Sequence, residues 1–458
     1  MIGDASPQPF WLDQPSAPSA RAPLDGAVDA DLLVVGGGLT GIWSALLASE
    51  AGKRVVLLEG ERLAFGASGR NGGFCSASLT HGLANGLARW PREIEALERM
   101  GRANLDETRA TLARHSIDCG WEDTGTLDVA TAPHQLPWLS EQAAQLRRFG
   151  WDAELLDEAA VRAHVDSPTY RGGVWARDAA ALVDPARLCW GLALTAEAAG
   201  AAIFECSPVT QLRRDAAGVR AATAAGASVR ARHVMLATSA FPPLVRAIRR
   251  YVVPVYDYVL VTEPLSPAQR EAIGWRARQG ISDMANRFHY YRLTADDRIL
   301  WGGYDAVYDF GGRVGPERDQ RPATFELLAE HFFATFPQLE GLRFTHRWGG
   351  AIDTCTRFSA LWGRALGGRA VYVVGFTGLG VGASRFGARV ALDLLDGLDT
   401  ERTRLEMVRR RPLPFPPEPA RWASIALTQR ALARADQRAG RRGPWLRALD
   451  RLGLGFDS

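Results

Sequence analysis

The sequence lacks the features that mark disulfide-rich, zinc-binding and membrane-spanning proteins. Its five cysteines are odd in number, widely spaced and never paired as C-x-x-C, which fits neither a disulfide framework nor a zinc site. No uncharged apolar run approaches the roughly 20 residues that a membrane helix needs, and the first 30 residues lack a charged start followed by an apolar stretch. We therefore expect a cytoplasmic protein with no transmembrane span and no bound metal.

The sequence also lacks a large excess of charge of either sign. The 54 basic and 51 acidic residues leave a formal net charge of +3, spread along the chain. Without a broad basic field, binding to nucleic acid is not expected, and small-molecule chemistry is favoured. Lys53 is the single lysine, which limits mechanism because lysine and arginine differ chemically.

The chain is long enough for more than one hydrophobic core. It has 458 residues, of which 47% are hydrophobic, and one core rarely grows beyond roughly 250–300 residues. We therefore expect at least two domains.

A complete βαβ unit stands near the start. The apolar run 31–35 leads directly into a G-x-G-x-x-G turn, residues 42–51 have helical apolar spacing, and 55–58 form a second apolar run. Such glycines let the backbone approach a pyrophosphate, whose charge lies at the positive end of the helix. The expected contacts are Gly36, Gly38, Leu39, Thr40 and Gly41.

An acidic residue ends the second strand. Glu59 lies roughly 20 residues after the glycines, where a carboxylate accepts hydrogen bonds from a ribose and disfavours a 2′-phosphate. An adenosine diphosphate group with a free ribose is therefore expected, as in NAD or FAD. A second glycine-rich segment favours FAD, because it suits a surface beneath a flat ring. The expected FAD contacts in this segment are Ser68, Gly69, Arg70, Asn71, Gly72 and Gly73, and Gly60, directly after Glu59, is a further one.

These motifs, one earlier in the chain and three later ones occur together in one known group. The sequence resembles the D-amino-acid oxidase-like superfamily of FAD-dependent oxidoreductases, and most closely its γ-glutamylputrescine oxidase-type branch, over residues about 10 to 400. The resemblance rests on F-W-L-D at 10–13, the dinucleotide turn, G-A-S-G-R-N-G-G at 66–73, L-V-D-P at 182–185, R-W-G-G at 347–350 and G-F-T-G-L-G-V-G at 375–382.

The resemblance implies an α/β plus α+β fold with discontinuous domains. A Rossmann-like, glutathione-reductase-like FAD domain is expected from 29–90, 172–250 and 346–400. A substrate domain on a mixed, largely antiparallel sheet is expected from 91–171 and 251–345. Residues 1–28 form an N-terminal extension, and 401–458 form a proline-rich connector and an arginine-rich helical tail. We expect the tail to pack on its own protein or to contact a partner.

The resemblance also implies the chemistry. A hydride passes from the carbon that bears the amine to the flavin, and the imine then hydrolyses, so no catalytic side chain is assigned. The helix start at 380–384 suits the flavin's pyrimidine edge. Further expected FAD contacts are Val209, Thr238, Gly350, Gly378, Leu379, Gly380, Val381 and Gly382.

Three departures from the family pattern bear on function. Ile352 and Gly378 stand where relatives that oxidise α-amino acids carry arginines for the carboxylate, which favours an amine without one; Arg292 and Arg357 are possible substitutes. Asn71 and Gly350 stand where relatives attach the flavin covalently, so non-covalent FAD is expected. Lys53 is too far along the nucleotide fold to activate oxygen, which leaves oxidase and dehydrogenase both open.

Substrate contacts are expected from aromatic residues of the strand-rich region 251–304. Side chains two apart share a strand face, so Tyr256 lies on the same face as Tyr258, and His289 on the same face as Tyr291. The substrate cleft is assigned to Tyr258, His289, Tyr291 and Trp348. The alternatives are an α-amino-acid oxidase or dehydrogenase, a monooxygenase, and a non-catalytic flavoprotein subunit. Oxygen or another acceptor takes the electrons.

Overall fold

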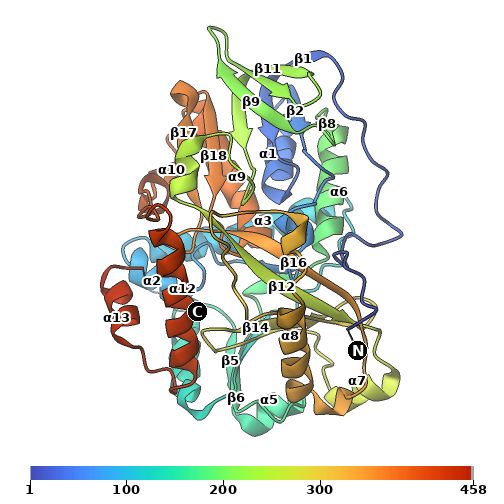
Figure 1. Cartoon of the computed structure of the whole chain (residues 1–458), viewed down its shortest axis with the longest axis vertical. Helices are drawn as coiled ribbons and strands as arrows, with labels where there is room; N and C mark the ends of the chain where they lie inside the picture. Colours follow the sequence, from blue (N-terminus) through green and yellow to red (C-terminus); the bar gives the residue numbers. More distant parts are fainter. Residues whose placement is uncertain (1, 455–458) are drawn as a thin grey trace.

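A computed structural model describes residues 2–454 and contains two eight-stranded sheets, one above the other in Figure 1. The Rossmann-like sheet has the order β17-β18-β11-β1-β2-β8, with β10 and β9 added beside β11. Its main pairs are parallel, apart from β17 with β18. The strands are β1 (Ala27–Val35), β2 (Val55–Leu58), β8 (Ala202–Phe204), β9 (Val209–Arg214), β10 (Val219–Thr223), β11 (Ser228–Leu236), β17 (Leu361–Ala365) and β18 (Ala370–Val374).

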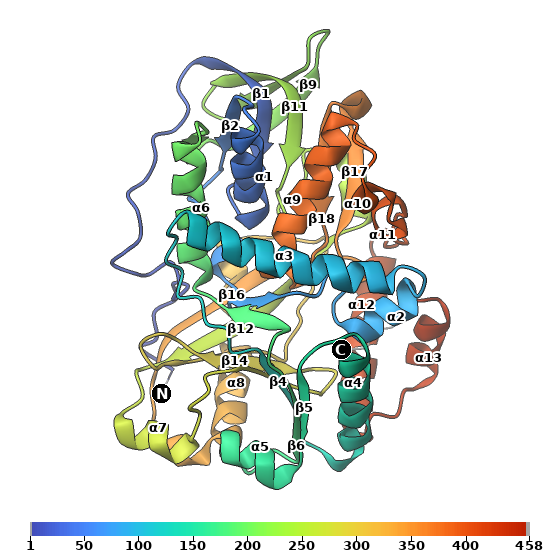
Figure 2. The same cartoon turned by 180° about the vertical axis from the view of Figure 1, so that it is seen from behind.

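Three helices cover one face of this sheet. They are α1 (Leu39–Glu50), α6 (Pro185–Ala198) and α9 (Gly380–Asp396), and Figure 2 shows the long α3 (Ile94–Arg114) crossing below them. Asp184 caps α6 by accepting from the amides of Ala186 and Arg187, each at 3.0 Å. The βαβ unit that the sequence predicts is confirmed.

The second sheet has the order β16-β12-β15-β14-β13-β4-β6-β5. All its pairs are antiparallel except β13 with β4, which confirms a mixed, largely antiparallel sheet. The strands are β4 (Thr126–Ala130), β5 (Ala153–Leu156), β6 (Gly172–Ala176), β12 (Val253–Thr262), β13 (Gly280–Asp283), β14 (His289–Leu293), β15 (Ile299–Gly303) and β16 (Phe344–Thr354).

Helices pack on the second sheet away from the Rossmann-like sheet. α8 (Pro322–Thr335) packs on β12, and α4 (Leu136–Arg148) packs on β5 and β6. α5 (Glu158–His164) and α7 (Pro267–Ile273) lie at the far end in Figure 1. Between the sheets run α2 (Leu83–Arg89) and the short pair β3 (Phe74–Ser76) and β7 (Ala180–Leu182).

Strand pairing corrects the expected domain boundaries at two points. Residues 172–176 form β6, and most of 346–354 lies in β16, yet both strands belong to the second sheet rather than to the FAD domain. β16 pairs with β12 along almost its whole length, from Val253 opposite Thr354 to Thr262 opposite Phe344. The R-W-G-G motif therefore belongs to the sheet expected to hold substrate.

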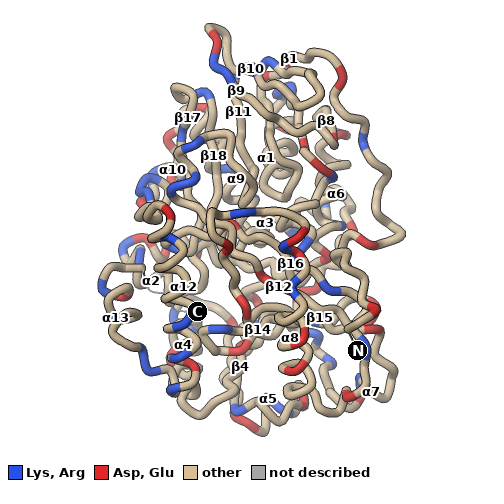
Figure 3. Tube along the Cα trace, in the orientation of Figure 1, with Lys and Arg blue, Asp and Glu red and all other residues tan. Residues whose placement is uncertain are grey.

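The tail packs on its own chain. It comprises α10 (Glu401–Arg404), α11 (Glu406–Arg409), α12 (Ala420–Asp436) and α13 (Pro444–Arg451), and α12 runs along the side of the second sheet in both cartoon views. Charged residues of both signs are scattered over the trace (Figure 3). Among the described residues, no helix is long and apolar enough to cross a membrane.

Candidate functional site

A single cavity of about 1520 Å³ runs from the Rossmann-like sheet to the second sheet and the tail. Ligand pockets usually measure roughly 300–1000 Å³, so this one has space for a cofactor and a second molecule. Its walls come from the β1–α1 turn, the 65–72 loop, the start of α9, strands β12, β14 and β16, and α12.

The glycine turn after β1 leaves backbone where side chains would normally stand. A Cβ on Gly36, whose φ is +110°, would lie 2.5 Å from the Ala237 carbonyl oxygen, and one on Gly41 would lie 1.8 Å from the Gly36 oxygen. Gly38 is the N-cap of α1 and, being glycine, has no side chain to cap the helix; the Leu39 amide donates to Ser68 Oγ at 2.9 Å. This geometry fits a pyrophosphate at the helix start.

Glu59 borders the same turn. Its Oε2 accepts from the Gly37 amide at 2.5 Å, and its Oε1 accepts from the Glu61 amide at 2.9 Å. Burial raises the pKa of this carboxyl, and the amide donors oppose that effect. Since Glu59 lines the cavity at the end of β2, it is placed to hold a ribose hydroxyl.

The polar side chains of the 66–73 segment make hydrogen bonds within the protein, both inside the loop and to neighbouring segments. Asn71 Nδ2 donates to the Ala67 oxygen at 2.9 Å, and its Oδ1 accepts from the Gly73 amide at 2.7 Å. Arg70 donates to Asp319 at 2.7 Å and to the Gly349 oxygen at 2.9 Å. The backbone of this loop, more than its side chains, is therefore offered to a ligand.

Four of the expected cofactor contacts serve packing instead. Gly41, Gly69, Gly73 and Gly382 do not line the cavity, and an added Cβ on each would come within 2.5 Å of a carbonyl oxygen. Such close backbone contact requires glycine without requiring a ligand. The others do line it: Gly36, Gly38, Leu39, Thr40, Glu59, Gly60, Ser68, Arg70, Asn71, Gly72, Val209, Thr238, Gly350, Gly378, Leu379, Gly380 and Val381.

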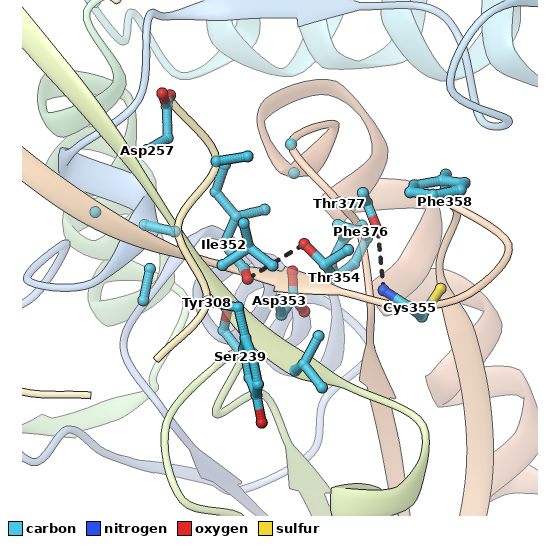
Figure 4. Close-up of a pocket in the computed structure, with 18 of the residues that line it drawn as sticks. Ser239, Asp257, Tyr308, Ile352, Asp353, Thr354, Cys355, Phe358, Phe376 and Thr377 are labelled. Atoms are coloured by element: carbon cyan, nitrogen blue, oxygen red, sulfur yellow. Dashed lines mark hydrogen bonds between the residues drawn. The ribbon is translucent and has the colours of Figure 1, made fainter. Parts of the chain in front are cut away.

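The loop before α9 is held by a buried carboxylate that sequence reasoning missed. Asp353, at the end of β16, accepts from the Gly375 amide at 2.6 Å and lines the cavity (Figure 4). Burial raises the pKa of Asp353 to about 7, although backbone donors oppose the shift. Thr377 Oγ1 accepts from the Cys355 amide at 3.3 Å, so the start of α9 is tied to the end of β16.

The four side chains assigned to the substrate cleft lie elsewhere. Tyr258 packs against Phe325 of α8 with ring centroids 5.6 Å apart, and Tyr291 bonds to the Tyr170 hydroxyl at 2.7 Å. His289 Nδ1 lies 2.7 Å from Asp283. Trp348 is 0% exposed and donates to the Arg70 oxygen at 3.0 Å. None of Tyr258, His289, Tyr291 and Trp348 lines the cavity.

For Tyr258, His289 and Tyr291 the physical reason for this correction is strand alternation, whereas Trp348 lies on the face of Asp257 and is covered by the loop at Arg70. Tyr256 shares a face with Tyr258, and His289 with Tyr291, as expected, but that face packs on α8 and the core of the second sheet. Asp257 and Tyr290, on the opposite face, line the cavity. A period of two assigns faces but not which face borders a hollow.

Asp257 and Tyr290 form a polar pair where the second sheet borders the cavity. The Tyr290 hydroxyl donates to Asp257 Oδ2 at 2.6 Å, and the Tyr258 amide donates to Oδ1 at 2.8 Å. Burial raises the pKa of Asp257 to about 6, opposed by the Tyr290 hydrogen bond. Asp257 lies opposite Gly350 in the β12–β16 ladder, where the R-W-G-G motif meets the cavity. A single charge inside an apolar strand was the only sequence signal for it.

Neither of the two arginines that the sequence suggested replaces the missing carboxylate clamp. Arg292 is buried and donates to the oxygens of Leu293 at 3.0 Å and Val183 at 2.7 Å. Arg357 is buried and donates to the Arg410 oxygen at 2.7 Å and to that of Ala360. Neither of them lines the cavity, whereas Ile352 does.

Of the remaining reactive side chains, one lines the cavity and two do not. Lys53 is paired with Asp396 at 2.5 Å on the far side of the nucleotide fold and does not line the cavity. Cys75 is buried away from it, whereas Cys355 lines it and donates from Sγ to the Ser359 oxygen at 3.1 Å. Among the described residues, no group of three or more histidine, cysteine, aspartate or glutamate side chains could hold a metal ion.

Comparison with known proteins agrees with this geometry. The DAO family model, described as FAD dependent oxidoreductase, matches residues 31–394. Gamma-glutamylputrescine oxidoreductase of Escherichia coli is 33% identical over 391 residues, covering 83% of this chain and 86% of that one. The probable oxidoreductase OrdL of Haemophilus influenzae is 28% identical, covering 85% and 88%.

A solved structure shows the same fold at low identity. L-proline dehydrogenase from P. horikoshii superposes with a TM-score of 0.69 at 16% identity, covering 83% of this chain and 96% of that one. The glycine cradle, the acid after β2 and a cavity large enough for two molecules fit the cofactor of this family. The chain belongs to the DAO family of FAD-dependent oxidoreductases.

Proposed function

We propose that this enzyme oxidises the C–N bond of an amine that carries no carboxylate on the reacting carbon. Bound FAD supplies the acceptor for the hydride, and the resulting imine hydrolyses. The FAD is held without a covalent link, because Asn71 and Gly350 offer no nucleophile and the Asn71 amide is used within its own loop. The amine class agrees with the name of the 33% identical relative.

One observation carries the proposal: a carboxylate, Asp257, lines the cavity on the side of the second sheet. An anion there attracts an ammonium group and repels a substrate carboxylate. The places of the carboxylate-binding arginines hold Ile352 and Gly378, both of which line the cavity. The site thus offers a carboxylate to an amine and has no arginine at either position where relatives bind an α-carboxylate. Two arginines of the lining, Arg70 and Arg287, are paired with Asp319 and Asp305.

Asp257 has a second task in this proposal. Hydride leaves an amine readily only when its nitrogen is neutral, so an ammonium must lose a proton. Burial that raises the pKa of Asp257 to about 6 makes its carboxylate a stronger base than an exposed aspartate. Tyr290, donating at 2.6 Å, holds the carboxylate in place while it binds the substrate nitrogen.

Anaerobic reduction of the bound flavin tests this function. The holoenzyme is mixed with γ-glutamylputrescine, putrescine and simple alkylamines, and separately with glycine, D-alanine and L-proline. We expect the amines to bleach the flavin and the α-amino acids to leave it oxidised. Comparable bleaching by the amino acids would overturn the proposal, and bleaching by neither group would favour a non-catalytic flavoprotein.

A matched pair of variants locates the effect. Asp257→Asn keeps the shape and can still accept from Tyr290, so flavin content should not change. We expect the rate of bleaching by amine to fall about 100-fold, since loss of one partner of a buried charge pair costs roughly 2–5 kcal/mol. Asp283→Asn, which alters a carboxylate on the other side of the sheet bonded to His289, should leave that rate within about twofold.

The electron acceptor is identified from the oxidative half-reaction, in which the reduced flavin is reoxidised. Reduced enzyme is mixed with air-saturated buffer in a stopped-flow instrument. Reoxidation much faster than that of free flavin would identify an oxidase, and a rate no faster would identify a dehydrogenase that uses another acceptor.

A further inference from the structure

The outer wall of the cavity is made by the chain beyond residue 400. The family match ends at residue 394, yet α12, α13 and the proline-rich connector before them supply a large part of the lining. Figure 1 shows α12 standing alongside the second sheet. The apolar members include Phe415, Trp422, Ile425, Leu432, Trp445 and Leu449.

This wall is tied to the body at both ends of α12. Before its first turn, Glu418 accepts from the Tyr308 hydroxyl at 2.6 Å and from the Gly311 amide at 3.1 Å. At its last residue, Asp436 accepts from the Asn286 amide at 2.9 Å and from the Asn286 Nδ2 at 2.7 Å. The segment is therefore a built part of the cavity and not a loose appendage.

The apolar residues of the tail face a hollow and not a core. Within α12, all of which the structure describes, Ala435 is the one fully buried residue, and within α13 it is Leu446. Ile425 and Leu432 keep part of their surface, and they line the cavity. Phe288, just before β14, and Val307, in the segment after β15, line it from the opposite side. When an apolar ligand displaces water from apolar surface that faces a hollow, the free energy of the system falls and binding is favoured.

Several polar groups of the same wall are occupied within the protein. Gln429 Nε2 donates to the Ala306 oxygen, and Thr428 Oγ1 accepts from Trp445 Nε1 at 3.0 Å. Ser424 donates to the Arg421 oxygen at 2.9 Å. Arg287 is paired with Asp305 and lies over the Tyr304 ring, 3.9 Å from its centroid. Hydrogen-bonding capacity that is already used adds little to recognition of a polar ligand.

We infer that this outer chamber, bounded by α12, α13, Phe288 and Val307, binds an alkyl chain or aromatic ring attached to the reacting amine. The inference rests on the proposed function and narrows it: the nitrogen lies at Asp257, and the apolar remainder of the substrate extends towards the tail. A substrate with a charged far end, such as γ-glutamylputrescine, fits this chamber less well than an amine of similar length without charge.

A chain-length series measures the chamber. The kcat/KM of the holoenzyme is determined for n-alkylamines from propylamine to octylamine. Each buried methylene should raise kcat/KM about fourfold until the chamber is filled. Putrescine, whose far end is charged, should react more slowly than the uncharged amine of the same length.

Two variants of the lining and one matched control assign the effect to the tail. Ile425→Ala and Leu432→Ala should lower kcat/KM for octylamine about tenfold and leave propylamine unchanged. Leu427→Ala lies on the same helix but is 41% exposed and does not line the cavity, so it should alter neither. Retained flavin and an unchanged melting temperature show that a variant is folded, and the two lining variants check each other.

The outcomes separate this inference from the function on which it rests. If amines reduce the flavin but chain length and Ile425→Ala have no effect, the chamber is overturned and the function stands. If no amine reduces the flavin, the chamber is still tested by the change in the protein's tryptophan fluorescence during titration with 1-octanol and 1-propanol, since Trp422 and Trp445 line it. Octanol binding that Ile425→Ala weakens supports the chamber, and no binding overturns it.

Discussion

The two ends of the cavity are built from different materials. At the cofactor end, the main chain of the β1–α1 turn comes so close to itself that a Cβ on Gly41 would lie 1.8 Å from the Gly36 oxygen. At the substrate end, the strands of the second sheet present side chains, among them Asp257 and Tyr290. An added methyl group at the cofactor end should therefore abolish cofactor binding. A changed side chain at the substrate end should alter which molecules react and at what pH.

The largest effect should follow from Gly41→Ala. The methyl group meets backbone that cannot move without displacing α1 from β1, so we expect less than about a tenth of the wild-type flavin to remain bound. The measurement is the ratio of flavin to protein absorbance after purification. Gly52→Ala is the control: its φ is +79°, but nothing lies within 4 Å of its Cβ, so it should lose only roughly 1 kcal/mol of stability. Equal flavin content in both variants would refute the contrast.

The second effect concerns pH at the substrate end. Because the pKa of Asp257 is raised to about 6, kcat/KM for an amine should rise as the pH increases through 6, when the carboxylate becomes ionised. In Asp257→Asn this rise should disappear and leave a low, flat profile on the acidic side. An unchanged inflection near pH 6 in the variant would assign it to another group.

The same carboxylate should also reduce stability. The folded protein binds its proton more tightly than the unfolded chain, where an aspartate titrates near pH 4. Ionisation between about pH 4 and pH 6 therefore lowers the free energy of unfolding. Asp257→Asn should melt at a higher temperature than wild type at pH 8, and the gap should close towards pH 4. A variant that is less stable at pH 8 would contradict this sign.

A smaller effect should follow from Tyr290→Phe. The hydroxyl donates to Asp257 at 2.6 Å and stabilises its ionised form. We expect kcat/KM for an amine at pH 7 to fall about fivefold and the acidic inflection to move to higher pH, because the remaining carboxylate holds its proton more tightly. A fall in rate with no movement of the inflection would show that Tyr290 acts on the substrate directly.

The smallest effect should follow from Lys53→Met. The lysine is paired with Asp396 at the surface of the nucleotide fold, and such pairs contribute roughly 0–1 kcal/mol. The rate of flavin reoxidation in air should stay within experimental error of wild type. A marked slowing would mean that oxygen chemistry depends on a residue outside the cavity.

The second sheet explains where prediction from sequence stopped. The hairpin of β14 and β15 and the shared faces of Tyr256 with Tyr258 and of His289 with Tyr291 were all predictable from alternation. Which face borders the cavity depends on where α8 packs, and α8 follows those strands in the chain. Choosing the aromatic face therefore selected core residues and passed over Asp257.

By itself, the sequence determined the βαβ unit, the acid at Glu59 and the family, because these depend on glycine conformations and spacing within short segments. The tertiary structure decided that Gly69, Gly73 and Gly382 serve packing, since that depends on which distant carbonyl lies above each of them. It also decided that Arg292 bonds to the Val183 oxygen and is not available to a substrate. Finally, it placed the tail against the cavity, because a helix with few buried residues has no local signal for what it faces.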